Sequence, residues 1–196
     1  LRNENEWPLK NTSWTKFYLS PDELSLEKES KEANFKLSYN NLGDGITFMT
    51  ESFLEDTEIT GPIASKLFIS SETEDTDLFL ITRLFNEQQQ EVTFQGALDP
   101  KTPLAQGWLR ASHRRIDNHL SKPYRPYHTH DKVELLIPKK VYEVDIEIWP
   151  TSIVVPKGYR IGLTIKGQDY VNQSGGGSTL PNLSLIHISE PTRRPI

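Results

Sequence analysis

The sequence predicts an all-β fold, an antiparallel β-sandwich. Two stretches, Tyr142 to Ile148 and Ile161 to Ile165, alternate apolar and polar residues with a period of two, which is typical of strands with one face in a core and one in water. The chain of 196 residues also holds 13 prolines and 11 glycines and lacks long helical patterns. We therefore expect short strands separated by turns around one core.

The most clearly specified part of the chain is the stretch 141–165. Its first strand is expected to end at Trp149-Pro150, because proline cannot donate a hydrogen bond to the ladder. A second short run, 153–155, leads to a turn at 156–158 that contains proline and glycine, and an alternating strand follows.

The rest of the chain is divided by turn residues into further short strands. Leu78 to Phe85 is apolar at both odd and even positions, which predicts a central strand covered on both faces, with 92–97 as its partner. A long irregular segment, 117–138, is expected to serve a function or to pack on another surface, because such loops are uncommon in compact domains. Other strands are expected at 16–19, 24–26, 46–50, 55–60, 63–69 and 108–112.

Composition excludes several classes of partner and site. The net charge is −5 and no basic stripe is present, so nucleic acid is not an expected partner. The chain holds no cysteine, which excludes disulfides, thiolate metal sites and cysteine nucleophiles and fits a reducing, cytoplasmic location. No signal peptide and no apolar run of membrane-spanning length is found, so we expect no membrane partner.

Several segments, in the same order along the chain, carry a resemblance to a known family. They are EVDIEIWPTSIVVPKGYRIGLTIKGQDY at 143–170, ITGPIASKLFISSETEDTDLFL at 59–80, GWLRASHR at 107–114 and RPYHTH at 125–130. From Trp7 to Tyr170 the chain resembles the C-terminal domain of X-prolyl dipeptidyl peptidases, cocaine-esterase-type (CocE/NonD) serine hydrolases and their acylase relatives.

The resemblance implies a jelly-roll, galactose-binding-like sandwich that supports an α/β-hydrolase body of the same parent chain. In that division residues 1–15 form a linker from the preceding α/β-hydrolase domain, 16–170 form the jelly roll and 171–196 form a flexible, non-native tail. The family's closing strands are expected to be missing, because linker composition and the stretch 184–196 stand in their place. An edge left open in this way would permit a homo-oligomer.

No catalytic residue is assigned to this chain. An α/β-hydrolase carries its nucleophile in a G-x-S-x-G elbow. No such motif occurs here, and Ser174 lies in SGGGS without the flanking strand and helix. The resemblance implies that the serine, aspartate and histidine of the triad lie in the body. Ser112 and His113 are neighbours on an expected strand and would point to opposite faces, so adjacency does not make them a nucleophile–base pair.

Two groups of side chains could bind a metal ion, but we assign neither metal nor cofactor. A histidine pair on an extended chain would need a third ligand that its spacing does not fix. Rows of acidic residues suit calcium, but they are more often the solvated face of a sheet or part of a turn. The residues considered are His128, His130 and Asp131 for a transition metal, and Glu143, Asp145, Glu147, Asp75 and Asp77 for calcium.

Five aromatic residues are the candidates for a surface that docks on the hydrolase body. Tryptophan and tyrosine bury a large area and keep a polar tip in water, which suits domain interfaces. The alternative function is a stand-alone carbohydrate-binding or adhesive module, and a G-x-S-x-G segment encoded upstream of Leu1 would distinguish the two. The docking candidates are Trp7, Trp14, Trp108, Tyr124 and Tyr127, of which the last three are also the candidates for a sugar platform.

Overall fold

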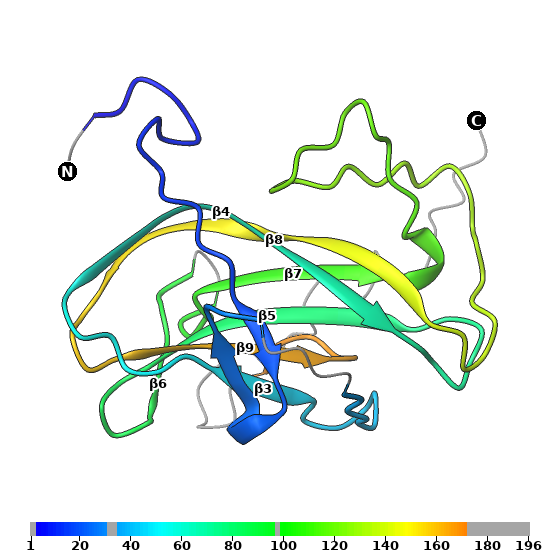
Figure 1. The fold of residues 1–196 in the computed structure, drawn as a ribbon, viewed down its shortest axis with the longest axis horizontal. Coiled ribbons are helices and arrows are strands. Elements are labelled where there is room, and N and C mark those ends of the chain that lie inside the picture. The colour runs from blue at the N-terminus through cyan, green and yellow to red at the C-terminus, as the bar shows by residue number, and fades with distance from the viewer. Residues whose placement is uncertain (1–2, 31–34, 97–98, 172–196) are drawn as a thin grey trace.

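The computed structural model describes residues 3–30, 35–96 and 99–171. Within these residues the chain forms strands and two 3-10 turns, which confirms the predicted all-β class (Figure 1). The strands are β1 (Tyr18–Ser20), β2 (Ser25–Glu27), β3 (Ile46–Met49), β4 (Thr57–Ile69), β5 (Asp77–Phe85), β6 (Glu91–Val92), β7 (Ala105–Arg110), β8 (Tyr142–Val155) and β9 (Arg160–Lys166). The 3-10 turns are η1 (Asp22–Leu24) and η2 (Ala111–His113).

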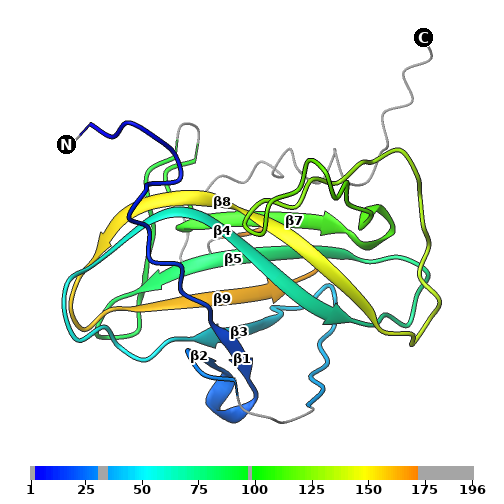
Figure 2. The ribbon, with the colours of Figure 1, turned by 45° about the horizontal axis from the view of Figure 1, so that its top comes forward.

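The strands form two sheets that pack as layers (Figure 2). The larger sheet has the order β1-β2-β3-β9-β5-β6, and β7 also pairs with β5. The smaller sheet consists of β4 and β8. The pairings between these strands are antiparallel except for a short parallel contact of β2 with β3 at Ser25 and Met49. The predicted antiparallel sandwich is therefore present.

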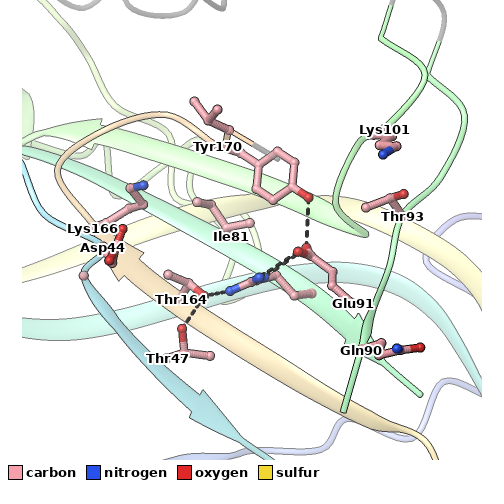
Figure 3. Close-up of a pocket in the computed structure, with 13 residues that line it drawn as sticks. Asp44, Thr47, Ile81, Gln90, Glu91, Thr93, Lys101, Thr164, Lys166 and Tyr170 are labelled. Carbon is pink, nitrogen blue, oxygen red and sulfur yellow. Dashed lines mark hydrogen bonds and ion pairs between the residues drawn. The ribbon is translucent and has the colours of Figure 1, made fainter. Parts of the chain in front are cut away.

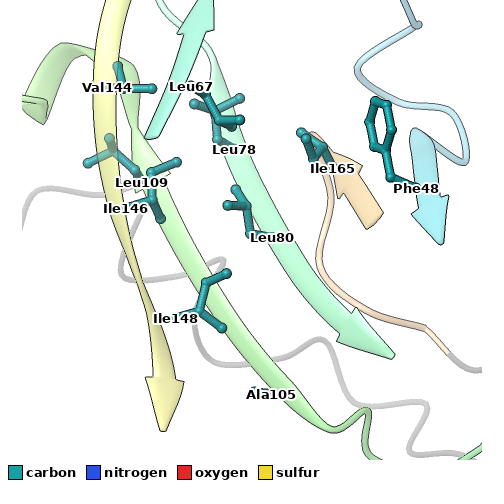
Figure 4. Close-up of a cluster of buried hydrophobic side chains, with 10 residues drawn as sticks. All are labelled: Phe48, Leu67, Leu78, Leu80, Ala105, Leu109, Val144, Ile146, Ile148 and Ile165. Carbon is teal, nitrogen blue, oxygen red and sulfur yellow. The ribbon is translucent and has the colours of Figure 1, made fainter. Parts of the chain in front are cut away.

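The core lies between the two sheets (Figure 4). The predicted alternation along β8 is confirmed, because Val144, Ile146 and Ile148 are each at most 2% exposed. Strand β5 is also central as predicted, since it is buried at nearly every position and lies between β9 and β7. The buried apolar cluster consists of Phe48, Leu67, Leu78, Leu80, Ala105, Leu109, Val144, Ile146, Ile148 and Ile165.

Strand β8 does not end at Trp149-Pro150, contrary to the prediction. It continues through both residues, and its register with β4 shifts between Gly61 and Ile63, directly opposite them. Two residues of β8 thus oppose one residue of β4, which is the count of a β-bulge. Because the bulge takes Pro150 out of the ladder, its missing N–H costs no hydrogen bond. The same bulge joins the predicted strands 55–60 and 63–69 into the single strand β4.

The prediction of 92–97 as the partner strand of β5 is wrong for most of that range. Strand β6 is only two residues long, and beyond it the chain forms an isolated bridge from Phe94 to Thr102. Strand β7 is the main partner instead, from Asp77 opposite Arg110 to Thr82 opposite Ala105. It starts and ends earlier than the predicted 108–112, because the chain turns into η2 after position 110.

Several predictions fall on residues outside the described ranges. These are the missing closing strands and the flexible, non-native character of the tail, since the described part ends at Val171. The predicted linker is described from Asn3 onward and contains no strand before β1. Within the described ranges, no helix has the length and apolar character that crossing a bilayer would require.

Candidate docking surface

The segment 117–138 is held against one end of the sandwich by backbone hydrogen bonds. The Thr129 N–H donates to the Arg115 carbonyl at 3.1 Å, and the Glu134 N–H donates to the Ser112 carbonyl at 2.8 Å. Leu136 adds an apolar anchor, since it is only 3% exposed. The long segment is thus packed on the sandwich over part of its length.

Arg110, the last residue of β7, ties this end of the sandwich together by binding Asp77 at the start of β5. Its Nε donates to Asp77 Oδ1 at 2.9 Å and its Nη2 donates to Asp77 Oδ2 at 3.1 Å. This bidentate geometry is the strong form of an arginine–carboxylate contact. The hydrogen bond to Asp77 raises the pKa of Arg110.

Arg114 fixes the segment 117–138 to the turn η2. Its guanidinium donates to the carbonyls of Ala111, at 3.0 Å, and of Glu134. Its carbon Cζ also lies 4.5 Å from the centroid of the Tyr142 ring, within the range of a cation–π contact. The motif GWLRASHR, one of the segments that carry the family resemblance, therefore has a structural role at this end of the sandwich.

An aromatic stack joins the N-terminal segment to the segment 117–138. The rings of Trp14 and Tyr124 are stacked with centroids 5.1 Å apart and an interplanar angle of 17°. Both segments lie on the β4–β8 side of the sandwich (Figure 1). Trp14 remains 55% exposed, so one face of the stack is open to a partner.

A cavity of about 280 Å³ lies beside Tyr124. Its apolar wall comes from the N-terminal segment and from the prolines at the β4–β8 bulge, while two cationic residues and one acidic residue supply polar groups. The bulge that the sequence analysis missed therefore forms part of this cavity. The lining residues are Trp7, Pro8, Pro62, Lys122, Tyr124, Arg125, Glu147 and Pro150.

Trp108 adjoins this region through Trp149, which the sequence analysis did not single out as a site residue. The two indole rings meet edge to face, with centroids 5.2 Å apart at 64°. Trp149 lies in the bulge next to Pro150 and is 60% exposed. Trp149 directly follows the alternating stretch 142–148, but the expected strand end at Pro150 concealed its part in a larger surface.

The structure brings together three of the five predicted aromatic residues. Trp7 and Tyr124 line one cavity, and Trp14 stacks on Tyr124. Tyr127 lies on the same segment and is 48% exposed, but it makes no ring contact within the described part of the chain. We call Trp7, Trp14, Trp108, Tyr124 and Trp149 the aromatic surface.

Ser112 is occupied by a structural contact. Its hydroxyl donates to Asp75 Oδ2 at 2.6 Å, and the residue is only 1% exposed. It lies in η2 and not on a strand, which corrects the expected geometry. His113 faces His130 instead, with their Nδ1 atoms 3.3 Å apart.

The acidic candidates for a metal site are engaged in other contacts. Lys66 forms ion pairs with Glu143 and with Asp145, the latter at 3.0 Å, and Asp75 and Asp77 bind the turn after β7. Across the described ranges, no group of three or more histidine or acidic side chains is arranged to hold a metal ion.

A larger cavity of about 740 Å³ lies on the outer face of the large sheet, away from the core (Figure 3). Arg83 donates to both carboxylate oxygens of Glu91, at 2.9 and 2.6 Å, and the Tyr170 hydroxyl donates to Glu91 at 3.0 Å. The hydrogen bond to Glu91 raises the pKa of Arg83. These charged groups satisfy one another, so they stabilise the outer face of the sheet.

Comparison with known families gives a match over nearly the whole chain. The family model described as the X-Pro dipeptidyl-peptidase C-terminal non-catalytic domain matches residues 1–183. Among curated proteins, two that are named as serine esterases, from Mycobacterium bovis and Mycobacterium tuberculosis, are each 28% identical over 132 residues. That match covers 63% of this chain and 19% of each relative.

Solved structures show the same architecture. A CocE/NonD family hydrolase from Staphylococcus aureus matches with a TM-score of 0.84 at 25% identity, over 92% of this chain and 33% of its own. An aminopeptidase from a marine sediment archaeon of the Thaumarchaeota matches with a TM-score of 0.60 at 15% identity, over 87% of this chain and 31% of its own, and supports the fold alone. The chain therefore spans about a third or less of the length of these relatives.

Proposed function

This chain belongs to the X-Pro dipeptidyl-peptidase C-terminal non-catalytic domain family, and on that premise we propose that it supports the catalytic body of a larger serine hydrolase. The body would be an α/β-hydrolase domain of the same parent chain and would supply nucleophile, base and oxyanion hole. The parent would cleave an ester or an X-Pro amide through an acyl-enzyme. Its substrate depends on that body, because function resides in the site and not in the sandwich.

The Trp14–Tyr124 stack supports this role most directly. It holds the N-terminal segment against the segment 117–138 on the β4–β8 side of the sandwich. A domain that precedes the N-terminal segment would reach this side first. The aromatic surface there has the composition of an interface core, which is enriched in tryptophan and tyrosine.

The cavity beside Tyr124 has both positive and negative side chains, so it fits a partner surface that carries both charges. Lys122 and Arg125 lie at the same cavity as Glu147, so a docked domain could present both a carboxylate and a donor to it. Polar groups at the edge of an apolar patch fix the register of an interface more than its affinity. The sandwich would then form one wall of the substrate entrance of the body.

The test begins with the DNA upstream of the Leu1 codon. The proposal predicts a continuous reading frame that encodes G-x-S-x-G within an α/β-hydrolase segment. In the parent protein, a Trp14→Ala, Tyr124→Ala double variant should lower esterase or Xaa-Pro amidase activity and resistance to proteolysis between the domains. Tyr127→Ala is the matched control. A reading frame without a hydrolase segment would contradict the proposal.

A stand-alone carbohydrate-binding module is the second candidate. It rests on the cavity beside Tyr124, where the ring of Trp7 and the carboxylate of Glu147 could offer stacking and hydrogen bonds to a sugar. Glycan-array binding by the isolated chain that is lost on Trp7→Ala would favour this function. Absence of binding in the same assay would leave only the docking role.

A further inference from the structure

Three histidines gather where the segment 117–138 meets η2, outside the aromatic surface. The Nδ1 atoms of His113 and His130 lie 3.3 Å apart, and their ring centroids are 5.4 Å apart. The ring of His128 is centred 5.9 Å from that of His130, and its Nε2 is buried with no hydrogen-bond partner within the described ranges. Nothing in the docking role accounts for this cluster.

We propose that His113 and His130 form a binding site for a divalent transition metal ion such as zinc. Two nitrogens that each lie 2.0–2.1 Å from a tetrahedral zinc ion are about 3.3 Å apart. The two Nδ1 atoms already have this separation of 3.3 Å. Since no set of three protein ligands is arranged around an ion in the described part of the chain, water would complete the coordination.

The backbone holds both imidazoles in place before any ion binds. His113 ends η2 between two anchored neighbours, Ser112 and Arg114. His130 has φ of 51°, a left-handed conformation that residues other than glycine rarely adopt and that persists only where the surroundings impose it. The neighbouring Thr129 N–H supplies part of that restraint by donating to the Arg115 carbonyl at 3.1 Å.

A cation next to the two imidazoles would repel a metal ion unless a carboxylate balanced its charge. The cation of Arg115 lies 3.5 Å from the carboxylate of Asp131, the residue after His130, so its charge is balanced. The site therefore combines two imidazole nitrogens with a neighbouring cation that is already paired.

The contact that a metal ion would replace is a poor one. A distance of 3.3 Å between two imidazole nitrogens is longer than the usual range for N–H hydrogen bonds. The pair is also solvent-exposed, so an ion could reach it. Replacing this contact with two metal–nitrogen bonds would cost the fold little.

Zinc chloride titrated into the full chain by isothermal calorimetry tests the site. We expect one ion per chain, and we expect His130→Asn and His113→Gln each to weaken binding at least about tenfold. Asparagine suits position 130 because it tolerates a left-handed φ while lacking the imidazole. His119→Asn is the matched control, because it removes an exposed histidine of the same segment, and His187→Asn removes the histidine of the C-terminal region.

Melting curves by circular dichroism give a second, independent readout. Zinc should raise the melting temperature of the unmodified chain by several degrees and leave that of His130→Asn and His113→Gln unchanged, because only a ligand of the folded state stabilises it. The same curves without zinc report whether each variant folds. The site would be overturned if the unmodified chain does not bind zinc, or if both variants bind zinc as tightly as the unmodified chain.

Discussion

Ser112 and Asp75 are joined by two hydrogen bonds that use both oxygens of the carboxylate. The serine hydroxyl donates to Oδ2 at 2.6 Å, and the serine N–H donates to Oδ1 at 2.9 Å. Asp75 precedes β5, and Ser112 follows β7. The pair therefore locks two connections together at the end of the sandwich that carries the segment 117–138.

Ser112→Ala should lower the free energy of unfolding by about 1–2 kcal/mol, because a half-buried carboxylate loses its side-chain donor. Urea unfolding measures the change. Ser152→Ala is the control: this serine is exposed on β8 and shares a hydrogen bond with Thr60, so its effect should stay within about 0.5 kcal/mol. Equal effects of the two substitutions would show that the contact with Asp75 contributes nothing particular.

The chain alone should not hydrolyse p-nitrophenyl esters or Xaa-Pro chromogenic amides. The only serine–histidine neighbours in the sequence are Ser112 and His113, and the structure engages that serine with a carboxylate and not with an imidazole. Turnover that survives purification and disappears in Ser112→Ala would contradict this expectation.

At Gly107 the backbone of β8 lies too close to β7 to leave room for a side chain. A Cβ added there would lie 2.1 Å from the carbonyl oxygen of Glu147 and 2.9 Å from the Cα of Ile148. Because both are backbone atoms, they cannot rotate away, and Gly107→Ala should cost at least about 2 kcal/mol of stability. Gln106→Ala, at the neighbouring position of β7, should change stability by less than about 0.5 kcal/mol. If Gly107→Ala and Gln106→Ala unfold at the same urea concentration, β7 and β8 do not approach each other this closely.

A double-mutant cycle should detect the stack between Trp14 and Tyr124. Removing both rings is expected to cost less than the sum of the single changes, with a coupling of about 0.5–1.5 kcal/mol. The same cycle on Trp14 and Tyr127 is the control and should give a coupling near zero. If the two cycles give the same coupling, the N-terminal segment is not held by this stack.

Period-two alternation predicted the core well because it is a local signal. Val144, Ile146 and Ile148 alternate with polar residues and are buried in the first half of β8. The same signal failed at Trp149-Pro150, where proline suggested the end of a strand. A bulge takes proline out of the ladder without ending the strand, and nothing in the residues around Pro150 distinguishes the two outcomes.

The candidate sites depended on contacts between distant segments, which no local pattern encodes. Residue type alone selected Trp14 and Tyr124, but their stacking follows from how the chain folds back on itself. Spacing likewise suggested His128 and His130 as a pair, whereas the nearest imidazole nitrogen to His130 belongs to His113, on a different segment. Sequence reasoning thus found the residues more readily than their partners.

The aromatic surface leaves large apolar rings in water. Trp7, Trp14 and Trp149 are 53%, 55% and 60% exposed. Soluble monomers rarely leave large apolar patches uncovered, and those they do expose are often binding sites. We therefore expect the isolated chain to self-associate in the absence of a hydrolase body, with a mass by light scattering that rises with concentration.

Substitution on and off the surface identifies the face responsible. Trp7→Ser combined with Trp149→Ser should restore a monomer, because it removes two exposed rings of the aromatic surface. Phe68→Ser is the matched control: this ring is 70% exposed, but it lies opposite Glu143, at the far end of β4 from the bulge. If Phe68→Ser restores the monomer and the tryptophan variant does not, association uses another face. If the unmodified chain is a monomer at every concentration, the aromatic surface does not need a partner to cover it.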